Sequence, residues 1–98
     1  MRYTVVLSPE SDGAYSVVCP ALSGCVSQGD DLDDALANIR EAMELWLEVS
    51  REEDEEPPVE TPEVLSAEIA AILRERAEQG MPMTIETRVV DLPKPVVA

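Results

Sequence analysis

The sequence contains no histidine and no phenylalanine, and only three of its 98 residues are aromatic. Without histidine, Ser-His and Cys-His mechanisms are excluded, together with the commonest acid-base group at neutral pH. With so few aromatic residues, the interior must be filled by Val, Leu, Ile, Ala and Met. A chain of this length forms one domain with a thin core, which oligomerisation often stabilises.

Long apolar runs and a cysteine framework are also missing. No stretch approaches the roughly 20 apolar residues that span a membrane, and the first ten residues lack the apolar core of a signal peptide. We therefore expect a cytoplasmic protein with reduced thiols. Cys19 and Cys25 are too widely spaced for the usual zinc pair, and no histidine or third cysteine completes a site. We predict no metal and no cofactor.

Positive charge is scarce. The chain has 21 acidic and 7 basic residues, which gives a formal net charge of -14. Such a chain repels phosphates, so direct binding to nucleic acid is not expected. The charge attracts basic partners, including proteins that themselves bind nucleic acid. The alternative is that it only keeps the protein in solution.

Three short segments near the start have the composition of β-strands. Residues 3–7, 15–19 and 25–28 are rich in β-branched and aliphatic side chains and are separated by turn-forming residues. Residues 31–50 then predict a long helix, capped by Asp31, whose apolar side chains recur every three or four positions. This apolar stripe must lie against the sheet.

The second half of the chain has a different organisation. Residues 51–60 form an acidic, proline-containing linker, and a second helix is predicted from Thr61 to Gly80. Residues 84–90 predict a last strand, and residues 91–98 a loose tail. The last strand can pair within its own chain or with another subunit.

The order β-β-β-α, then α-β, predicts an α+β fold, a small antiparallel sheet with one long helix packed on it. Residues 1–50 form the βββα core and residues 51–60 the linker. Residues 61–98 form a helix and a strand that complete the sheet or build a subunit interface, with no recognisable DNA-binding module. Gly24 and Gly29 match no phosphate-binding motif and are interpreted as turn formers.

The stretch between residues 12 and 48 resembles the HicB family of bacterial antitoxins, and the resemblance extends over residues 1–50. It reads DGAYSVVCPALSGCVSQGDDLDDALANIREAMELWLE. The matching positions are Gly13, Tyr15, Cys19, Pro20, Leu22, Gly24, Cys25, Ser27, Gly29, Ala35, Ile39, Glu41 and Ala42.

The resemblance implies a partial ribonuclease-H-like fold that lacks the nuclease's working carboxylates. It also implies a partner, HicA, a small basic toxin that cleaves messenger RNA with a histidine and whose active surface the antitoxin hides. HicB-like proteins commonly form dimers or tetramers, so we expect a homo-oligomer.

The predicted function is therefore an antitoxin-like interaction protein, not an enzyme. The candidate partner-binding residues are Pro20 and Leu22 in the bend, with Glu10, Asp12 and Asp30 expected near the same end of the sheet. One alternative is a stand-alone, self-associating protein of unknown ligand. Another is a residual nuclease in which carboxylates such as Asp12 and Asp30 hold Mg²⁺.

Overall fold

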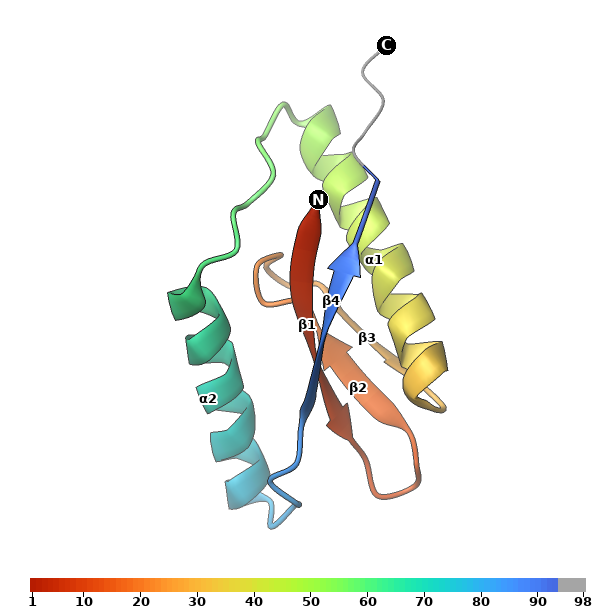
Figure 1. Ribbon diagram of the computed structural model, residues 1–98, viewed down its shortest axis with the longest axis vertical. Coiled ribbons are helices and arrows are strands. Elements are labelled where there is room, and N and C mark those ends of the chain that lie inside the picture. Colours follow the sequence, from red (N-terminus) through yellow and green to blue (C-terminus); the bar gives the residue numbers. More distant parts are fainter. Residues whose placement is uncertain (94–98) are drawn as a thin grey trace.

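The computed structural model describes residues 1–93 of the chain and contains four strands and two helices (Figure 1). The elements in chain order are β1 (Arg2–Pro9), β2 (Tyr15–Val18), β3 (Val26–Gly29), α1 (Leu32–Glu52), α2 (Pro62–Glu78) and β4 (Glu86–Asp91). The strands form one antiparallel sheet in the order β3-β2-β1-β4. The predicted α+β class and element order are confirmed.

The central strand β1 organises the sheet. Val6 lies opposite Val18 of β2, and Tyr3 lies opposite Val90 of β4. Successive side chains of a strand point to opposite faces, so β1 supplies both faces with buried apolar residues. β4 pairs with β1 of its own chain, which answers the question of pairing that the sequence left open.

The long helix α1 covers one face of the sheet (Figure 1). The Asp31 carboxylate accepts a hydrogen bond from the Asp34 amide at 2.8 Å, which caps the helix as predicted. Trp46 donates its indole N–H to the Ser23 carbonyl at 2.9 Å and so ties the helix to the bend after β2. The fully buried residues of the helix stripe are Ala35, Ile39 and Met43.

The second helix, α2, lies on the opposite side of the sheet from α1 (Figure 1). Its cap is the Thr61 hydroxyl, which accepts from the Val64 amide at 3.2 Å. Arg76 is buried, and its guanidinium donates to the carbonyls of Pro9 at 3.0 Å and Pro82 at 2.6 Å. This residue fastens the last turn of α2 to the end of β1.

The linker is attached to the sheet at its end. Tyr3 donates its hydroxyl to the Pro58 carbonyl at 2.7 Å. The Glu60 carboxylate accepts from the Thr4 amide at 2.6 Å and the Thr4 hydroxyl at 2.8 Å. The acidic, proline-containing linker predicted for residues 51–60 is thus fixed to the sheet at its last residues, because β1 offers the Thr4 donors to Glu60.

The tail is also more ordered than the sequence suggested. β4 continues to Asp91, and Leu92 is buried and exchanges backbone hydrogen bonds with Met1 at 2.7 and 2.8 Å. The loose tail predicted for residues 91–98 is therefore wrong at its beginning, because an apolar side chain at position 92 reaches the core. Residues 94–98 lie outside the described part of the chain.

The two glycines of the central loop region have different roles. Gly24 has a φ of 77° and is a turn former, as predicted. Gly29 is the last residue of β3 and is buried, so the prediction of a turn is wrong for it. A Cβ at this position would lie 2.6 Å from the Ala35 Cα and would collide with the Ala35 amide. Only a residue without a side chain fits at position 29, because the first turn of α1 lies directly against it.

Candidate protein-binding surface

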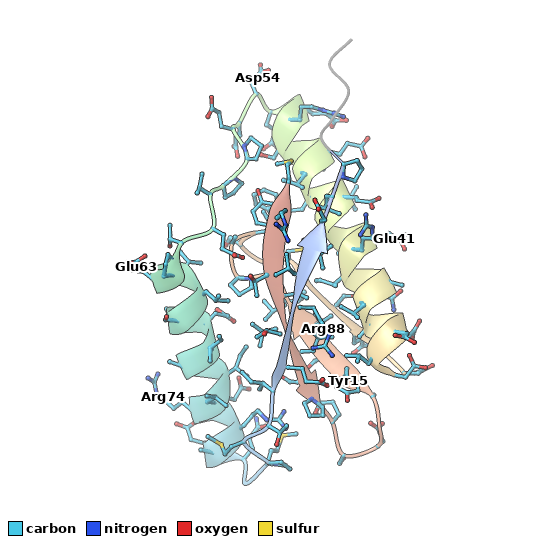
Figure 2. All side chains as sticks on the ribbon, viewed as in Figure 1. Tyr15, Glu41, Asp54, Glu63, Arg74 and Arg88 are labelled. Carbon is cyan, nitrogen blue, oxygen red and sulfur yellow. The ribbon has the colours of Figure 1, made fainter. Side chains whose placement is uncertain are left out.

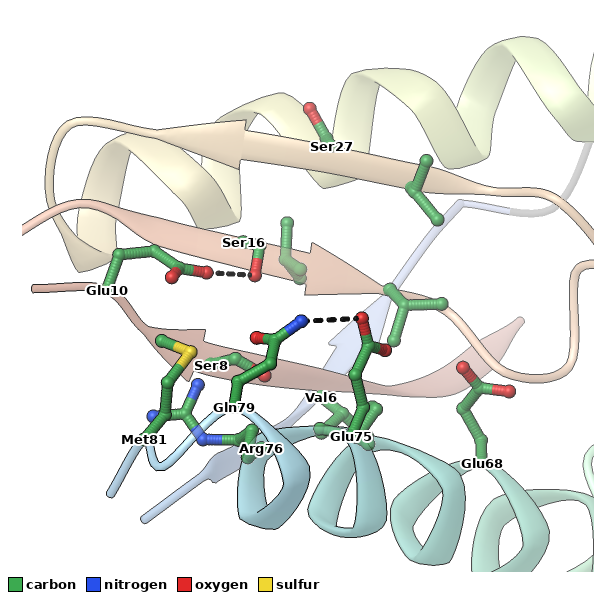
Figure 3. A pocket seen from close by; sticks show the side chains of 14 residues that line it. Val6, Ser8, Glu10, Ser16, Ser27, Glu68, Glu75, Arg76, Gln79 and Met81 are labelled. Carbon is green, nitrogen blue, oxygen red and sulfur yellow. Dashed lines mark hydrogen bonds between the residues drawn. The ribbon is translucent and has the colours of Figure 1, made fainter. Parts of the chain in front are cut away.

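A groove of about 370 Å³ lies between α2 and the sheet face that α1 does not cover (Figure 3). We call it the α2 groove. Its sheet side is formed by β1, β2 and β3, and Val6, Val18 and Val26 give it an apolar floor. Ile72 of α2 faces the same space, and 63% of the surface of Val26 is accessible. The groove therefore offers apolar surface to a partner.

The charged side chains of the α2 groove are mainly acidic. Glu10 accepts a hydrogen bond from the Ser16 hydroxyl at 2.8 Å, and Glu75 accepts one from Gln79 at 3.4 Å (Figure 3). Glu68 lines the groove from about two turns further back along α2. Arg76 also lines the groove, but its guanidinium is buried and already donates hydrogen bonds to two backbone carbonyls. The net charge of the groove is negative.

A second hollow of about 500 Å³ brings the predicted acidic residues together. Glu10, Asp12 and Asp30 all line it, and Asp34 accepts from the Asp30 amide at 2.9 Å within it. We call this surface the acidic end. It shares Glu10 and Ser16 with the α2 groove, so the two form one continuous acidic surface.

The structure does not bring Pro20 and Leu22 to this surface. The acidic residues precede β2 or follow β3, whereas the bend follows β2, and β2 and β3 are antiparallel. The bend therefore lies at the other end of the sheet, and the expectation of a shared end is wrong. Leu22 has no accessible surface, and Pro20 is half-buried. Leu22 serves the core in this conformation.

The cysteines stabilise the bend and are not placed for chemistry. Cys19 donates its amide to the Cys25 carbonyl at 3.0 Å, and both thiols are buried and free. Burial raises the pKa of Cys19 to about 12 and also raises the pKa of Cys25. Both thiols are therefore neutral at physiological pH and poor nucleophiles. Within residues 1–93, no three acidic or thiol side chains converge as a metal ion requires.

The acidic residues of α2 were not among the predicted partner-binding residues. Glu68 and Glu75 are seven positions apart, which places them on one side of a helix, with Ile72 between them. This spacing was available in the sequence. The missing information was which face of the sheet α2 covers, because the side chains of an unplaced helix cannot be assigned to a site.

A small α+β domain with an acidic, partly apolar surface and neutral thiols has the features of a protein-binding domain. The family comparison agrees with this class. The family model described as a HicB-like antitoxin of bacterial toxin-antitoxin systems matches residues 3–88. The chain belongs to this family, which supports an antitoxin role. No helix within residues 1–93 is both long and apolar enough to cross a membrane.

Three related proteins show the extent of the similarity. UPF0150 protein ssr1765 of Synechocystis is 53% identical over 47 residues, which are 48% of this chain and 60% of that protein. UPF0150 protein Ta0767 of Thermoplasma acidophilum is 38% identical over 66 residues, covering 67% of this chain and 96% of that one. The crystal structure of the N-terminal domain of the Burkholderia pseudomallei antitoxin HicB has a TM-score of 0.68 at 25% identity, covering 96% of this chain and 100% of that domain.

Proposed function

We propose that the chain binds a small, basic, HicA-type toxin that cleaves messenger RNA and covers the toxin's RNA-binding face. The observation that carries this proposal is the continuous acidic surface formed by the α2 groove and the acidic end. A protein face that holds RNA is basic, since it must bind phosphates. An acidic surface of complementary shape competes directly for that face.

The α2 groove combines the two features that such a complex needs. Its carboxylates, Glu10, Glu68 and Glu75, attract a cationic protein and speed the encounter. Its apolar floor, which includes Val18 and Val26, then loses contact with water and slows dissociation. Charge selects the partner, and apolar burial retains it.

The same features argue for inhibition by occlusion, without catalysis by this chain. The sequence has no histidine, and burial raises the pKa of Cys19 to about 12. Asp30 and Asp34 are joined through a backbone amide at the acidic end. The Asp34 carboxylate therefore has a structural role, and the carboxylates of Glu10, Asp12 and Asp30 remain on the surface that the proposal gives to a partner.

Co-expression tests this function. The probe is the product of the reading frame beside this gene, which the proposal expects to be small, basic and histidine-containing, and growth of cells that produce it is the readout. We expect the chain to restore growth. The variant E68K/E75K should lose this ability, because two cations would face the basic toxin across the groove.

The matched control is E41K/E48K. These two glutamates are exposed on α1 with the same spacing of seven residues, so both variants carry the same net charge. We expect the control to restore growth as the wild type does. Growth that is not restored by the wild type contradicts the function, and equal rescue by both variants contradicts the α2 groove as the binding surface.

A second candidate function is that of a self-associating protein without a toxin. It is favoured by the apolar residues that the sheet leaves exposed, Val26 at 63% and Val89 at 58%. If purified chain assembles with itself but does not bind the neighbouring protein, this function replaces the antitoxin.

A further inference from the structure

A further hollow, of about 410 Å³, lies where the C-terminal half of α1 meets the start of β3. We call it the α1 hollow. Three of the large apolar residues that the structure leaves exposed, Val26, Leu45 and Val49, line it together. Leu45 keeps 61% and Val49 44% of its surface accessible. Apolar side chains that are exposed singly need no explanation, but a contiguous group of them marks an interaction site.

Trp46 gives the α1 hollow an aromatic surface in a fixed position. It is half-buried and lines the hollow, and its indole N–H donates to the Ser23 carbonyl at 2.9 Å. This hydrogen bond holds the ring in one orientation. An aromatic side chain that is already held in place loses little conformational freedom when a partner binds, so it is well suited to anchor an apolar side chain.

One rim of the α1 hollow is acidic. Glu53 and Glu55 line it, and their backbone amides both donate to the Ser50 carbonyl, at 3.2 and 3.0 Å. Asp54 lies between them, in the turn that follows α1, with a φ of 56° (Figure 2). This turn holds the two glutamates beside the last carbonyls of the helix. The C-terminal end of a helix carries a partial negative charge, which adds to that of the carboxylates.

The wall next to these glutamates contains a buried hydroxyl without a partner. Ser50 lines the α1 hollow, and its Oγ makes no hydrogen bond within residues 1–93. A buried polar group that stays unpaired costs free energy, and such groups are uncommon in folded proteins. Arg51, the basic residue of the same helical turn, lines a different surface with Glu44 and Glu48. A positively charged hydrogen-bond donor would therefore complement this end of the hollow.

We propose that the α1 hollow binds a basic segment of another protein, which places an apolar side chain against Trp46 and a neighbouring lysine or arginine at Glu53 and Glu55. The apolar side chain covers the surface that Leu45 and Val49 leave exposed. The cation pairs with the two carboxylates and donates to the unpaired hydroxyl beside them. Apolar burial supplies the affinity, and the charges select a basic segment over a neutral or an acidic one.

Other occupants fit the α1 hollow less well. A second copy of this chain carries a net charge of -14, so it would bring like charges to the acidic rim. Nucleic acid and anionic lipid are repelled by the same carboxylates. Among the described residues, the hollow shares only Val26 with the lining of the α2 groove. The two surfaces can therefore be tested separately, and this proposal does not depend on the antitoxin function.

The test uses the full chain and a synthetic amphipathic peptide of leucine and lysine. Trp46 is the only tryptophan of the chain, so its fluorescence reports on the α1 hollow directly. We expect a saturable blue shift of its emission as the peptide is added, because the indole ring loses contact with water. A leucine-glutamate peptide of the same pattern should cause no shift. No shift with the lysine peptide, or equal shifts with both peptides, contradicts the proposal.

Two double variants test the apolar contact. L45Q/V49Q removes apolar surface from the α1 hollow at exposed positions, so the fold should be retained. We expect this variant to bind the lysine peptide at least about tenfold more weakly, since less apolar surface is buried in the complex. V59Q/V64Q is the matched control, because both valines are exposed outside the hollow. Equal affinities of the two variants would overturn the hollow as the binding site.

The polar contacts are tested with the same titration. At low salt E53Q/E55Q should bind the lysine peptide about threefold to tenfold more weakly, and more weakly than E41Q/E48Q, which removes the same charge elsewhere on α1. Ser50→Ala should weaken binding by about threefold without lowering the melting temperature, since the free chain loses no hydrogen bond. Equal losses in the two glutamate variants contradict the acidic rim. An emission that shifts when the chain alone is diluted would assign the hollow to a second copy and overturn the proposal.

Discussion

Gly29 illustrates how one small residue couples a strand to a helix. The position is buried, and a Cβ there would contact the backbone of Ala35 in the first turns of α1. The backbone of a helix cannot move aside as a side chain can. The absence of a side chain at Gly29 therefore sets how closely α1 approaches β3.

We predict that Gly29→Ala lowers the free energy of unfolding by about 2–3 kcal/mol, the cost of overpacking against a rigid neighbour. Gly13→Ala is the comparison: Gly13 has a φ of 89° with open space around it, so only backbone strain applies. That variant should lose about 1 kcal/mol. Urea denaturation measures both, and a Gly29→Ala variant as stable as the wild type would contradict the close approach.

Cys19 predicts a pH dependence of stability. Burial raises its pKa from 9.0 to about 12, so the unfolded thiol ionises first as the pH increases. The unfolded state then binds fewer protons than the folded state, and the free energy of unfolding falls as pH rises from about 9 towards 12. Below that range the contribution of the neutral thiol is fully present.

The check compares urea denaturation of the wild type and Cys19→Ala at neutral pH and at about pH 10. Cys19→Ala is less stable than the wild type at both pH values, since the substitution leaves a cavity. We expect its free energy of unfolding to fall less than that of the wild type when the pH is raised. Burial also raises the pKa of Tyr3, which both proteins retain. Equal losses in the two proteins would show that Cys19 does not titrate as described.

At this scale the sequence predicted part of the site. Glu10, Asp12 and Asp30 were selected because acidic residues are exposed and flank strands, and the structure places them around one hollow. Leu22 was selected from an apolar loop position and proved to be fully buried. The difference is physical: a charged side chain stays at the surface, whereas an exposed and a buried leucine look alike in a sequence.

At the scale of elements, α2 depends on a few polar anchors. Its apolar residues are only half-buried, and Val64 keeps 40% of its surface exposed. Arg76, in the last turn, donates to the Pro9 carbonyl of β1 and to the Pro82 carbonyl just after the helix. Glu60 accepts hydrogen bonds from Thr4 and so holds the preceding linker to β1. The position of α2, and hence the α2 groove, rests on these hydrogen bonds.

We predict that Arg76→Ala lowers the free energy of unfolding by about 2–3 kcal/mol, because two carbonyls lose a charged donor. Arg74→Ala in the same helix is exposed and should change it by no more than about 0.5 kcal/mol. Amide hydrogen exchange should also show faster exchange throughout α2 in the Arg76 variant. Equal effects of the two substitutions would exclude Arg76 as the anchor.

The elements were predicted more reliably than their contacts. The predicted helix at residues 31–50 agrees closely with α1, because its cap and apolar stripe are local features. The attachment of Glu60 to Thr4 was missed, since the partners are 56 residues apart. Which face of the sheet α2 covers was also not predicted, because this placement too depends on residues that are far apart in the sequence. Long-range pairing of polar groups leaves no periodic trace in a sequence.

At the scale of the whole molecule, one continuous acidic surface is built from several elements. The α2 groove and the acidic end present carboxylates, and the groove adds an apolar floor. Figure 2 shows Arg88 and Tyr15 on the sheet, between α1 and α2.

The most direct measurement is RNA cleavage by the purified product of the reading frame beside this gene, which we expect to be a basic HicA-type toxin, followed while the chain is added. We predict that one equivalent of the chain stops cleavage, that E41K/E48K does so equally well, and that E68K/E75K leaves most of the cleavage intact. Cleavage at full rate in the presence of excess wild-type chain, or equal inhibition by both variants, would contradict occlusion through the α2 groove.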